Sequence, residues 1–209
     1  MDERLVTVFG GGSPQPGDPA YREARRLGRA LARAGLGVAS GGYGGVMEAV
    51  SRGAAEAGGR ALGVTCARIE RWRGVRPNPW LTGQVRCRTL SGRARRLIEL
   101  GAALIALPGG VGTLSELAQA WSLLQVGEIG PRPLVAVGPA WARTLETFLR
   151  AAHAYLAPGD ERLLQRAADV PAAVRIVLRG LEPPPAAARP HTIPARTPRR
   201  TARASRRRG

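Results

Sequence analysis

The residues with the clearest chemical potential form a glycine-rich turn that directly follows the apolar run 102–107. Proline ends a strand because it has no N–H to donate, and glycines without a Cβ let backbone N–H groups approach a ligand. The positive end of a following helix adds to this preference for an anion. We therefore predict a phosphate-binding turn made by Pro108, Gly109, Gly110, Val111, Gly112 and Thr113.

A second glycine-rich turn, SGGYGGVM at residues 40–47, lies nearer the start of the chain. It separates a short apolar run from a helix-like segment, so its N–H groups can also hold a phosphate. Close packing of a helix on a strand selects glycine as well, and the pattern differs from the GxGxxG fingerprint of dinucleotide-binding folds. The residues assigned to this predicted cradle are Gly41, Gly42, Gly44, Gly45 and Met47.

Glu116 lies three residues after Thr113 and allows two interpretations. The spacing fits a capping box, in which Thr113 and Glu116 satisfy free N–H groups at a helix start. Side chains in the first turn of a helix also lean toward its N-terminus, which would bring the carboxylate to the phosphate turn. There it could stabilise positive charge developing on a ribose, or orient a water molecule. The two roles can coexist.

Arg93 belongs to an arginine cluster, SGRARR at residues 91–96, just before the apolar run. Arginine is mostly exposed in folded proteins, so a cluster of this kind is typical of a solvated helix face. Spacing alone therefore does not indicate a functional role for Arg93.

These residues need a scaffold, and short apolar runs alternating with helix-length segments predict one. The runs that indicate buried strands are residues 5–9, 37–39, 61–65, 102–107 and 134–137. Between them, apolar residues recur at helical spacing. The alternation predicts βαβ units and a single α/β domain with a doubly wound parallel sheet. Such sheets bind ligands at the carboxyl ends of their strands, where both glycine turns would lie.

The net charge of +17 is unevenly distributed along the chain. Residues 183–209 hold eight arginines, no acid and frequent proline. We therefore expect one domain at residues 1–181 and a disordered tail at residues 182–209, with at most weak, nonspecific nucleic-acid contact. The rest of the chain keeps a smaller basic excess, which suits an anionic ligand.

The residue types exclude several chemistries. The chain has no lysine, which rules out a Schiff base and the lysine of a P-loop. Its two cysteines and two histidines are isolated, so we expect no metal site, no disulfide and no need for a metal or redox cofactor. The acidic start of the chain and the lack of a membrane-length apolar run predict a cytoplasmic protein.

Residues 68–82, RIERWRGVRPNPWLT, predict an irregular connection. One interpretation is a surface loop that Trp72 and Trp80 anchor to the core. The other is a lid over the site.

The segment PGGVGTLSE at residues 108–116, with SGGYGGVMEAV upstream, resembles the LOG family. Proteins of that family are Rossmann-like, and its enzymes hydrolyse nucleoside 5′-monophosphates to base and ribose 5-phosphate. The opening VFGGGSPQPGDPAY is similar to the family's first loop, which adds Gly11 and Ser13 to the expected binding residues. The resemblance implies that Arg93 and Glu116 are the catalytic residues. It also implies a homodimer, for which WSLLQV at residues 121–126 offers apolar surface, although packing in the buried core explains the same residues about as well.

Two further function classes compete with hydrolysis. The family's lysine after the catalytic arginine is Ala94 here, and GGVMEAVSRGA and WSLLQVG are similar to molybdenum-cofactor carrier proteins, which bind a phosphorylated pterin without hydrolysing it. A carrier of a phosphorylated, nucleotide-like ligand is thus the second hypothesis. A DNA-binding relative of the DNA-processing protein A group ranks last, because the folded region shows no recognition element.

Overall fold

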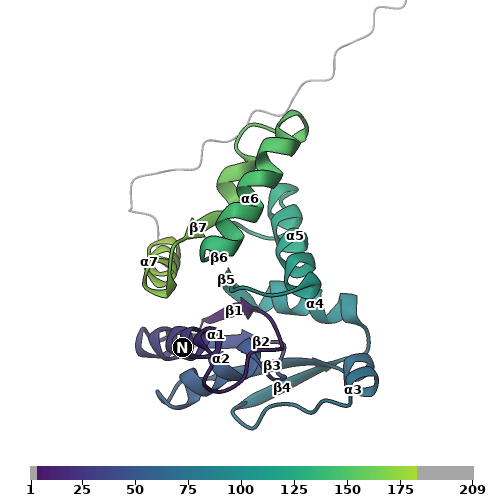
Figure 1. The fold of residues 1–209 in the computed structure, drawn as a ribbon, viewed down its shortest axis with the longest axis vertical. Coiled ribbons are helices and arrows are strands. Elements are labelled where there is room, and N and C mark those ends of the chain that lie inside the picture. Colours follow the sequence, from purple (N-terminus) through teal and green to yellow (C-terminus); the bar gives the residue numbers. More distant parts are fainter. Residues whose placement is uncertain (1–3, 183–209) are drawn as a thin grey trace, which may run out of the picture.

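The computed structural model describes residues 4–182, which form one seven-stranded parallel sheet with helices on both faces. Its strands lie in the order β4-β3-β2-β1-β5-β6-β7, from bottom to top in Figure 1. The strands are β1 Leu5–Phe9, β2 Gly37–Ser40, β3 Ala61–Cys66, β4 Gly83–Cys87, β5 Gly101–Ala106, β6 Leu134–Val137 and β7 Gln165–Ala167. The helices are α1 Pro19–Arg33, α2 Val46–Ala55, α3 Ala67–Arg73, α4 Leu90–Leu100, α5 Val111–Gln125, α6 Pro139–Ala152 and α7 Val170–Leu181.

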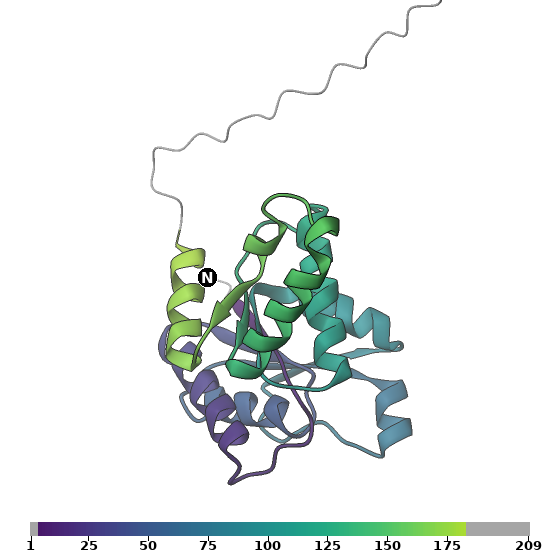
Figure 2. The same ribbon diagram turned by 45° about the horizontal axis from the view of Figure 1, so that its top comes forward.

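Alternate side chains of the strands feed two separate apolar cores. Val6, Val8 and Val38 pack with α1, α2 and α7 on one face of the sheet. Phe9 and Ala39 pack with α4, α5 and α6 on the other face. Figure 2 shows α7 beside α1, on the side of the sheet away from α4. The predicted Rossmann-like, doubly wound α/β domain is confirmed.

The five predicted strands are confirmed, but β4 and β7 were missed. β4 is an edge strand whose residues are alternately exposed and half-buried, so GQVRC does not form an apolar run. β7 has three residues, and two of them are exposed. The apolar pattern identifies strands covered on both faces and cannot identify these edge strands.

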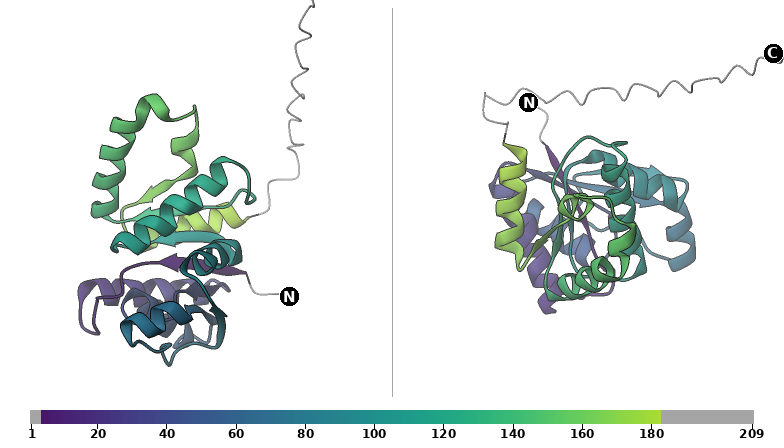
Figure 3. Two further views of the ribbon diagram at one scale, coloured as in Figure 1. Left: turned by 90° about the vertical axis from the view of Figure 1, so that its right-hand side faces the viewer. Right: turned by 90° about the horizontal axis from the view of Figure 1, so that it is seen from above.

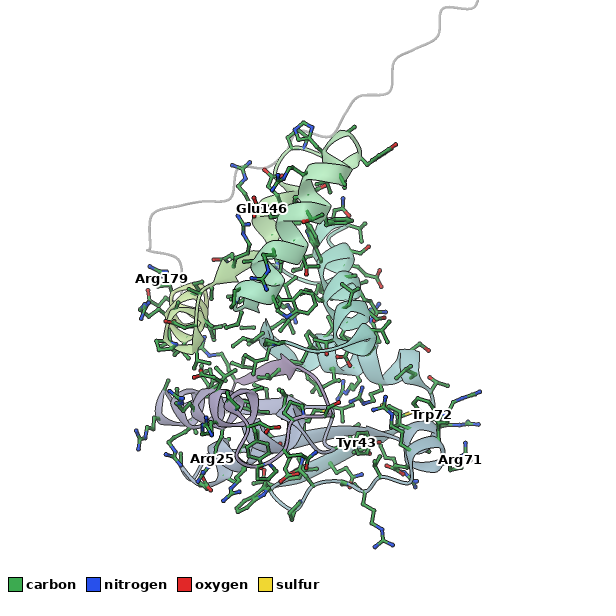
Figure 4. All side chains as sticks on the ribbon, in the orientation of Figure 1. Arg25, Tyr43, Arg71, Trp72, Glu146 and Arg179 are labelled. Atoms are coloured by element: carbon green, nitrogen blue, oxygen red, sulfur yellow. The ribbon has the colours of Figure 1, made fainter. Side chains whose placement is uncertain are left out.

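The connection at residues 68–82 begins with helix α3 and is not irregular throughout. Trp72 is 75% exposed, so it does not anchor the segment. Figure 4 shows it on α3 at the right-hand edge of the molecule. Trp80 is half-buried, with the Arg52 guanidinium 5.0 Å from its ring. The buried anchor is Asn78, whose N–H donates to the Gly42 carbonyl at 2.8 Å.

β1 and β5 are neighbours at the centre of the sheet, although more than ninety residues separate them. The chain leaves β1 toward one face and β5 toward the other, so the two following loops diverge at this point. In doubly wound sheets such a divergence creates the ligand crevice. Among the described residues, no helix is long and apolar enough to cross a membrane. The predicted tail lies almost wholly outside the described residues, so its disorder stays a prediction.

Candidate functional site

Three loops meet at the carboxyl edge of the sheet, after β1, β2 and β5. The N–H of Gly11 donates to the Pro108 carbonyl at 3.1 Å, which ties the first loop to the third. The N–H of Val46 donates to the Gly11 carbonyl at 2.9 Å, which ties the first loop to the start of α2. The first loop therefore holds the two predicted cradles side by side. Ser13 lies farther along this loop and is exposed.

Several of these glycines are required by the packing of the loops on one another. Gly45 has φ +72°, and a Cβ there would lie 2.5 Å from the Gly11 carbonyl oxygen. A Cβ at Gly109 would lie 2.1 Å from Thr113 Oγ1. A Cβ at Gly110 or Gly112 would meet no atom within 4 Å. Close packing thus explains part of the glycine pattern, and the open approach for a ligand lies along Gly110 and Gly112.

Helix α5 begins earlier than the sequence predicted. Its N-cap is Gly110, no side chain caps it, and Thr113 is a buried residue within the first turn. The capping box of Thr113 and Glu116 is therefore wrong. The N–H groups of Val111, Gly112 and Thr113 belong to the first turn, where an α-helix offers them no carbonyl partner. Val111 is 85% exposed, so this helix start is open to an anion.

Arg93 is 5% exposed, so the solvated helix face that spacing favoured is wrong for this residue. It lies in the first turn of α4, which begins after Thr89 and turns Arg93 toward the sheet. Its Nε donates to the Val64 carbonyl at 2.8 Å, and its Nη1 donates to Glu116 Oε1 at 3.1 Å. The structure thus joins the two residues that the family resemblance paired.

The space beside Gly41 and the side chains of Met47 and Tyr43 fix the position of the Arg93 guanidinium. A Cβ at Gly41 would lie 1.7 Å from Arg93 Nη2, so only glycine leaves room for the guanidinium. Nη2 also approaches the Met47 sulfur at 3.7 Å. The Tyr43 ring lies 5.8 Å from the guanidinium carbon, and its hydroxyl accepts from the Cys66 N–H at 2.7 Å. Tyr43 is buried, and Figure 4 labels it in the lower half of the molecule.

The Glu116 side chain is 13% exposed and keeps one carboxylate oxygen accessible. Oε1 accepts from Arg93, whereas Oε2 has no hydrogen-bond partner among the described residues. No buried side-chain oxygen or nitrogen of the described residues lacks a partner, so Oε2 must be in contact with solvent. Glu116 therefore presents one oxygen to the crevice while Arg93 holds the other.

Arg73 is a further candidate site residue, which the sequence did not predict. Its Nη1 lies 3.8 Å from the position that a Cβ at Gly12 would take. Its guanidinium also packs on the Trp72 ring, 4.8 Å from the ring centre. The last turn of α3 thus reaches over the first loop, which places a cation at the rim of the crevice. No motif marks this arginine among the many in the chain.

The chain's family follows from a match that covers this arrangement. A model of the SLOG cluster4 family matches residues 3–126, which run from β1 to α5 and include both glycine turns, Arg93 and Glu116. The chain belongs to the SLOG cluster4 family. The match covers more than half of the chain and contains every predicted site residue.

Relatives of this SLOG cluster4 protein include an enzyme and two molybdenum cofactor proteins. A cytokinin riboside 5′-monophosphate phosphoribohydrolase of Rhodococcoides fascians is 35% identical over 126 residues, 58% of this chain and 62% of that enzyme. The molybdenum cofactor carrier protein of Chlamydomonas reinhardtii is 26% identical, with a TM-score of 0.64 over 86% of this chain and 98% of that one. The molybdenum cofactor binding protein of Rippkaea orientalis is 20% identical, with a TM-score of 0.67 over the same shares of the two chains, and shares the fold.

Burial raises the pKa of the Glu116 carboxyl of the SLOG cluster4 protein above its ordinary value of 4.5, although the charge and hydrogen bond of Arg93 oppose the shift. A raised pKa means that the folded protein holds this proton more tightly than the unfolded chain does. The ionised form therefore costs stability above the raised pKa, and the cost disappears as the pH falls below 4.5.

Glu116→Gln is accordingly expected to melt at a higher temperature than the unmodified protein at pH 7. Glutamine keeps the shape and an oxygen for Arg93 but never ionises. The difference should shrink as the pH falls through the raised pKa and vanish below 4.5, which thermal melts across this pH range would measure. A lower melting temperature for Glu116→Gln at pH 7 would show that the ion pair stabilises the fold instead.

Proposed function

We propose that this protein is a phosphoribohydrolase, which cleaves the N-glycosidic bond of a nucleoside 5′-monophosphate to give a base and ribose 5-phosphate. The observation that carries the proposal is the Arg93–Glu116 pair beside the open start of α5. The name of the Rhodococcoides fascians relative supports it. That match spans 62% of the enzyme's length, so both activity and substrate are part of the proposal.

The start of α5 would bind the 5′-phosphate. The N–H groups of Val111, Gly112 and Thr113 supply donors, and the helix dipole adds partial positive charge. Arg73, at the rim of the first loop, supplies a full positive charge on the same side. A phosphate held there would bring the ribose toward Glu116, which lies one turn farther along the helix.

Glu116 would act at the anomeric carbon. As the C–N bond breaks, its electron pair leaves with the base and positive charge develops on the ribose. The accessible Oε2 can stabilise that charge or hold a water molecule, whose oxygen bonds to the anomeric carbon while its proton passes to the carboxylate. The departing base takes a proton in turn, so hydrolysis consumes one water. Arg93 would hold Glu116 in place through Oε1 and help to keep it ionised.

A second candidate function is the non-catalytic transport of a phosphorylated ligand. The likeness to the Chlamydomonas reinhardtii molybdenum cofactor carrier protein, over 98% of that chain, favours it. The same loops would hold the phosphate, and Glu116 would contact the ligand without turnover.

One screen separates the two functions. The purified full-length protein is incubated with purine and pyrimidine nucleoside 5′-monophosphates, and free base and ribose 5-phosphate are quantified. Equal amounts of both products, with no base released from nucleosides that lack the phosphate, are the expected result. Tight calorimetric binding of a phosphorylated ligand with no product from any substrate would favour the carrier.

We also propose a homodimer. Of the predicted apolar segment, Leu123 and Leu124 belong to the core, and the Trp121 indole donates to the Asp160 carbonyl. Exposed apolar side chains nevertheless remain on and beside α5, at Val111, Leu114 and Val126. We expect sedimentation at micromolar concentration to give twice the chain mass of 22.0 kDa. A mass of one chain would reject the dimer.

A further inference from the structure

Cys66 and Cys87 are far apart in the sequence but are neighbours in the sheet. Cys66 is the last residue of β3 and Cys87 the last residue of β4, and the parallel register pairs them directly. Both lie at the carboxyl edge of the sheet, toward which β1, purple in the left view of Figure 3, also runs. Adjacent strands are about 4.8 Å apart, and disulfides join residues whose Cα atoms are about 4.4–6.8 Å apart. The backbone spacing therefore suits a disulfide, although both thiols are free in this structure.

The two side chains lie on the same face of the sheet. Because side chains alternate along a strand, Cys66 shares a face with Val64, and Cys87 shares a face with Val85. Val64 belongs to the apolar core on the side of α4, and Val85 and Cys87 pack against that core. The Cys66 thiol also donates to the Arg88 carbonyl at 3.8 Å. It is therefore directed toward the end of β4, where Cys87 lies.

The two thiols differ in exposure. Cys66 is completely buried, whereas Cys87 is partly exposed. A small oxidant can therefore reach Cys87 first, and Cys66 is placed to attack the oxidised sulfur. The chain has no third cysteine, so a disulfide within one chain has a single possible pairing.

Each cysteine is linked to a structure that holds Arg93. The Cys66 N–H donates to the Tyr43 hydroxyl at 2.7 Å, and this hydroxyl donates to the Cys66 carbonyl at 3.1 Å. The Tyr43 ring in turn lies 5.8 Å from the Arg93 guanidinium carbon. Thr89, two residues after Cys87, is the N-cap of α4, the helix that carries Arg93. A movement of the two cysteines toward each other would therefore reach Arg93 from both sides.

We propose that Cys66 and Cys87 form a reversible disulfide when a peroxide oxidises them, and that this modification lowers the activity of the Arg93–Glu116 site. The effect on activity rests on the proposed phosphoribohydrolase function, whereas the disulfide itself does not. A disulfide holds its Cβ atoms about 3.8 Å apart, which is about 1 Å less than the spacing of neighbouring strands. The ends of β3 and β4 must therefore move together, which shifts the backbone that holds Tyr43 and the start of α4.

The oxidation has two steps. The Cys87 sulfur attacks one oxygen of hydrogen peroxide, so that an S–O bond forms and the O–O bond breaks; the leaving hydroxide takes the thiol proton and becomes water. The Cys66 sulfur then attacks the Cys87 sulfur, so that the S–S bond forms and the S–O bond breaks; this hydroxide takes the Cys66 proton and becomes a second water. The two thiols together lose two electrons, which reduce the peroxide. A dithiol reductant reverses the modification by thiol–disulfide exchange.

The disulfide is tested on the reduced full-length protein, treated with equimolar hydrogen peroxide. Intact mass and the free thiols of the denatured protein are measured over time. The expected result is the loss of two hydrogen atoms and of both thiols together, restored by dithiothreitol. Cys66→Ser should stop at the sulfenic acid, which dimedone traps on Cys87, and Cys87→Ser should keep Cys66 as a free thiol. Two free thiols after treatment, or a disulfide between two chains on a non-reducing gel, would overturn the proposal.

Base release before and after treatment tests the link to Arg93. The oxidised protein should release base about tenfold more slowly, because a positioning group displaced by a fraction of about 1 Å reduces the rate, and dithiothreitol should restore it. Cys87→Ser is the control and should retain full activity after treatment. A loss in this control would indicate oxidation elsewhere, such as at Met47, whose sulfoxide needs an enzyme for its reduction.

Two outcomes separate this proposal from the proposed function. Unchanged base release from fully disulfide-bonded protein would overturn the link to Arg93. No base release from the reduced protein would reject the phosphoribohydrolase function, and the mass and thiol measurements would still decide whether the disulfide forms.

Discussion

Glu116→Gln is expected to lower base release from nucleoside 5′-monophosphates by about a hundredfold or more, a loss near 3 kcal/mol in the transition state. Glutamine preserves the shape of the side chain and an oxygen that can accept from Arg93 Nη1. It removes the negative charge next to the anomeric carbon and the capacity to take a proton from water. Because the phosphate contacts lie elsewhere, the affinity for a phosphorylated ligand should change little. Steady-state kinetics and calorimetry on the same preparation would measure both effects.

Glu146→Gln is the matched control for this substitution. Glu146 pairs with Arg150 on the surface of α6, far from Tyr43 in Figure 4, so its loss should leave base release unchanged. The unmodified protein should lose activity as the pH falls through the raised pKa of Glu116, because the protonated carboxyl can no longer supply charge. Undiminished base release in Glu116→Gln would show that the Glu116 carboxylate has no catalytic role.

The core of the fold was predictable from the sequence because its strands are apolar on both faces. Runs such as residues 5–9 and 134–137 match β1 and β6 to the residue. The residues of β4 alternate in exposure, and β7 has only three residues. Both are strands because they pair with β3 and β6, and this pairing cannot be predicted from the local sequence. For the same reason, α3 and the anchor Asn78 were not predicted. Asn78 is fixed by a contact with Gly42, which is 36 positions away in the chain.

The site was predictable to a different degree at each residue. The glycine turns could be predicted because clustered glycines are unusual in a sequence, whether they are buried or exposed. The site role of Arg93 could not be predicted from its spacing, because an arginine on a helix is typically solvated. Arg93 is buried because Gly41 leaves space for its guanidinium and Glu116 accepts a hydrogen bond from it. Glu116 was visible, but the capping box was wrong because α5 begins at Val111 and so leaves Glu116 beyond the reach of the N-cap. Arg73 depends wholly on where α3 ends.

Gly41→Ala is expected to lower base release by about a hundredfold. The new methyl group would act indirectly, by displacing Arg93, and would not touch the substrate. The added Cβ would lie 1.7 Å from Arg93 Nη2 and 2.4 Å from the Met47 sulfur. Both atoms belong to flexible side chains, and Gly41 does not have a positive φ, so the backbone can accept alanine while the guanidinium must move. A displacement of about 1 Å in a positioning group can cost about a hundredfold in rate. The loss should therefore arise through Arg93 and its hold on Glu116.

A double-mutant cycle tests that route. Arg93→Ala alone should lose at least as much activity as Gly41→Ala, and Gly41→Ala/Arg93→Ala should lose no more than Arg93→Ala, because the methyl group can displace only a guanidinium that is present. Gly130→Ala is the control, since its Cβ would enter open space in a loop outside the predicted site residues, and it should retain full activity. Additive losses in the double variant would show that Gly41 acts on the ligand directly. In that case the turn at residues 40–47 would serve as a phosphate cradle. Glycine at position 41 would then be needed mainly for ligand binding and less to leave room for Arg93.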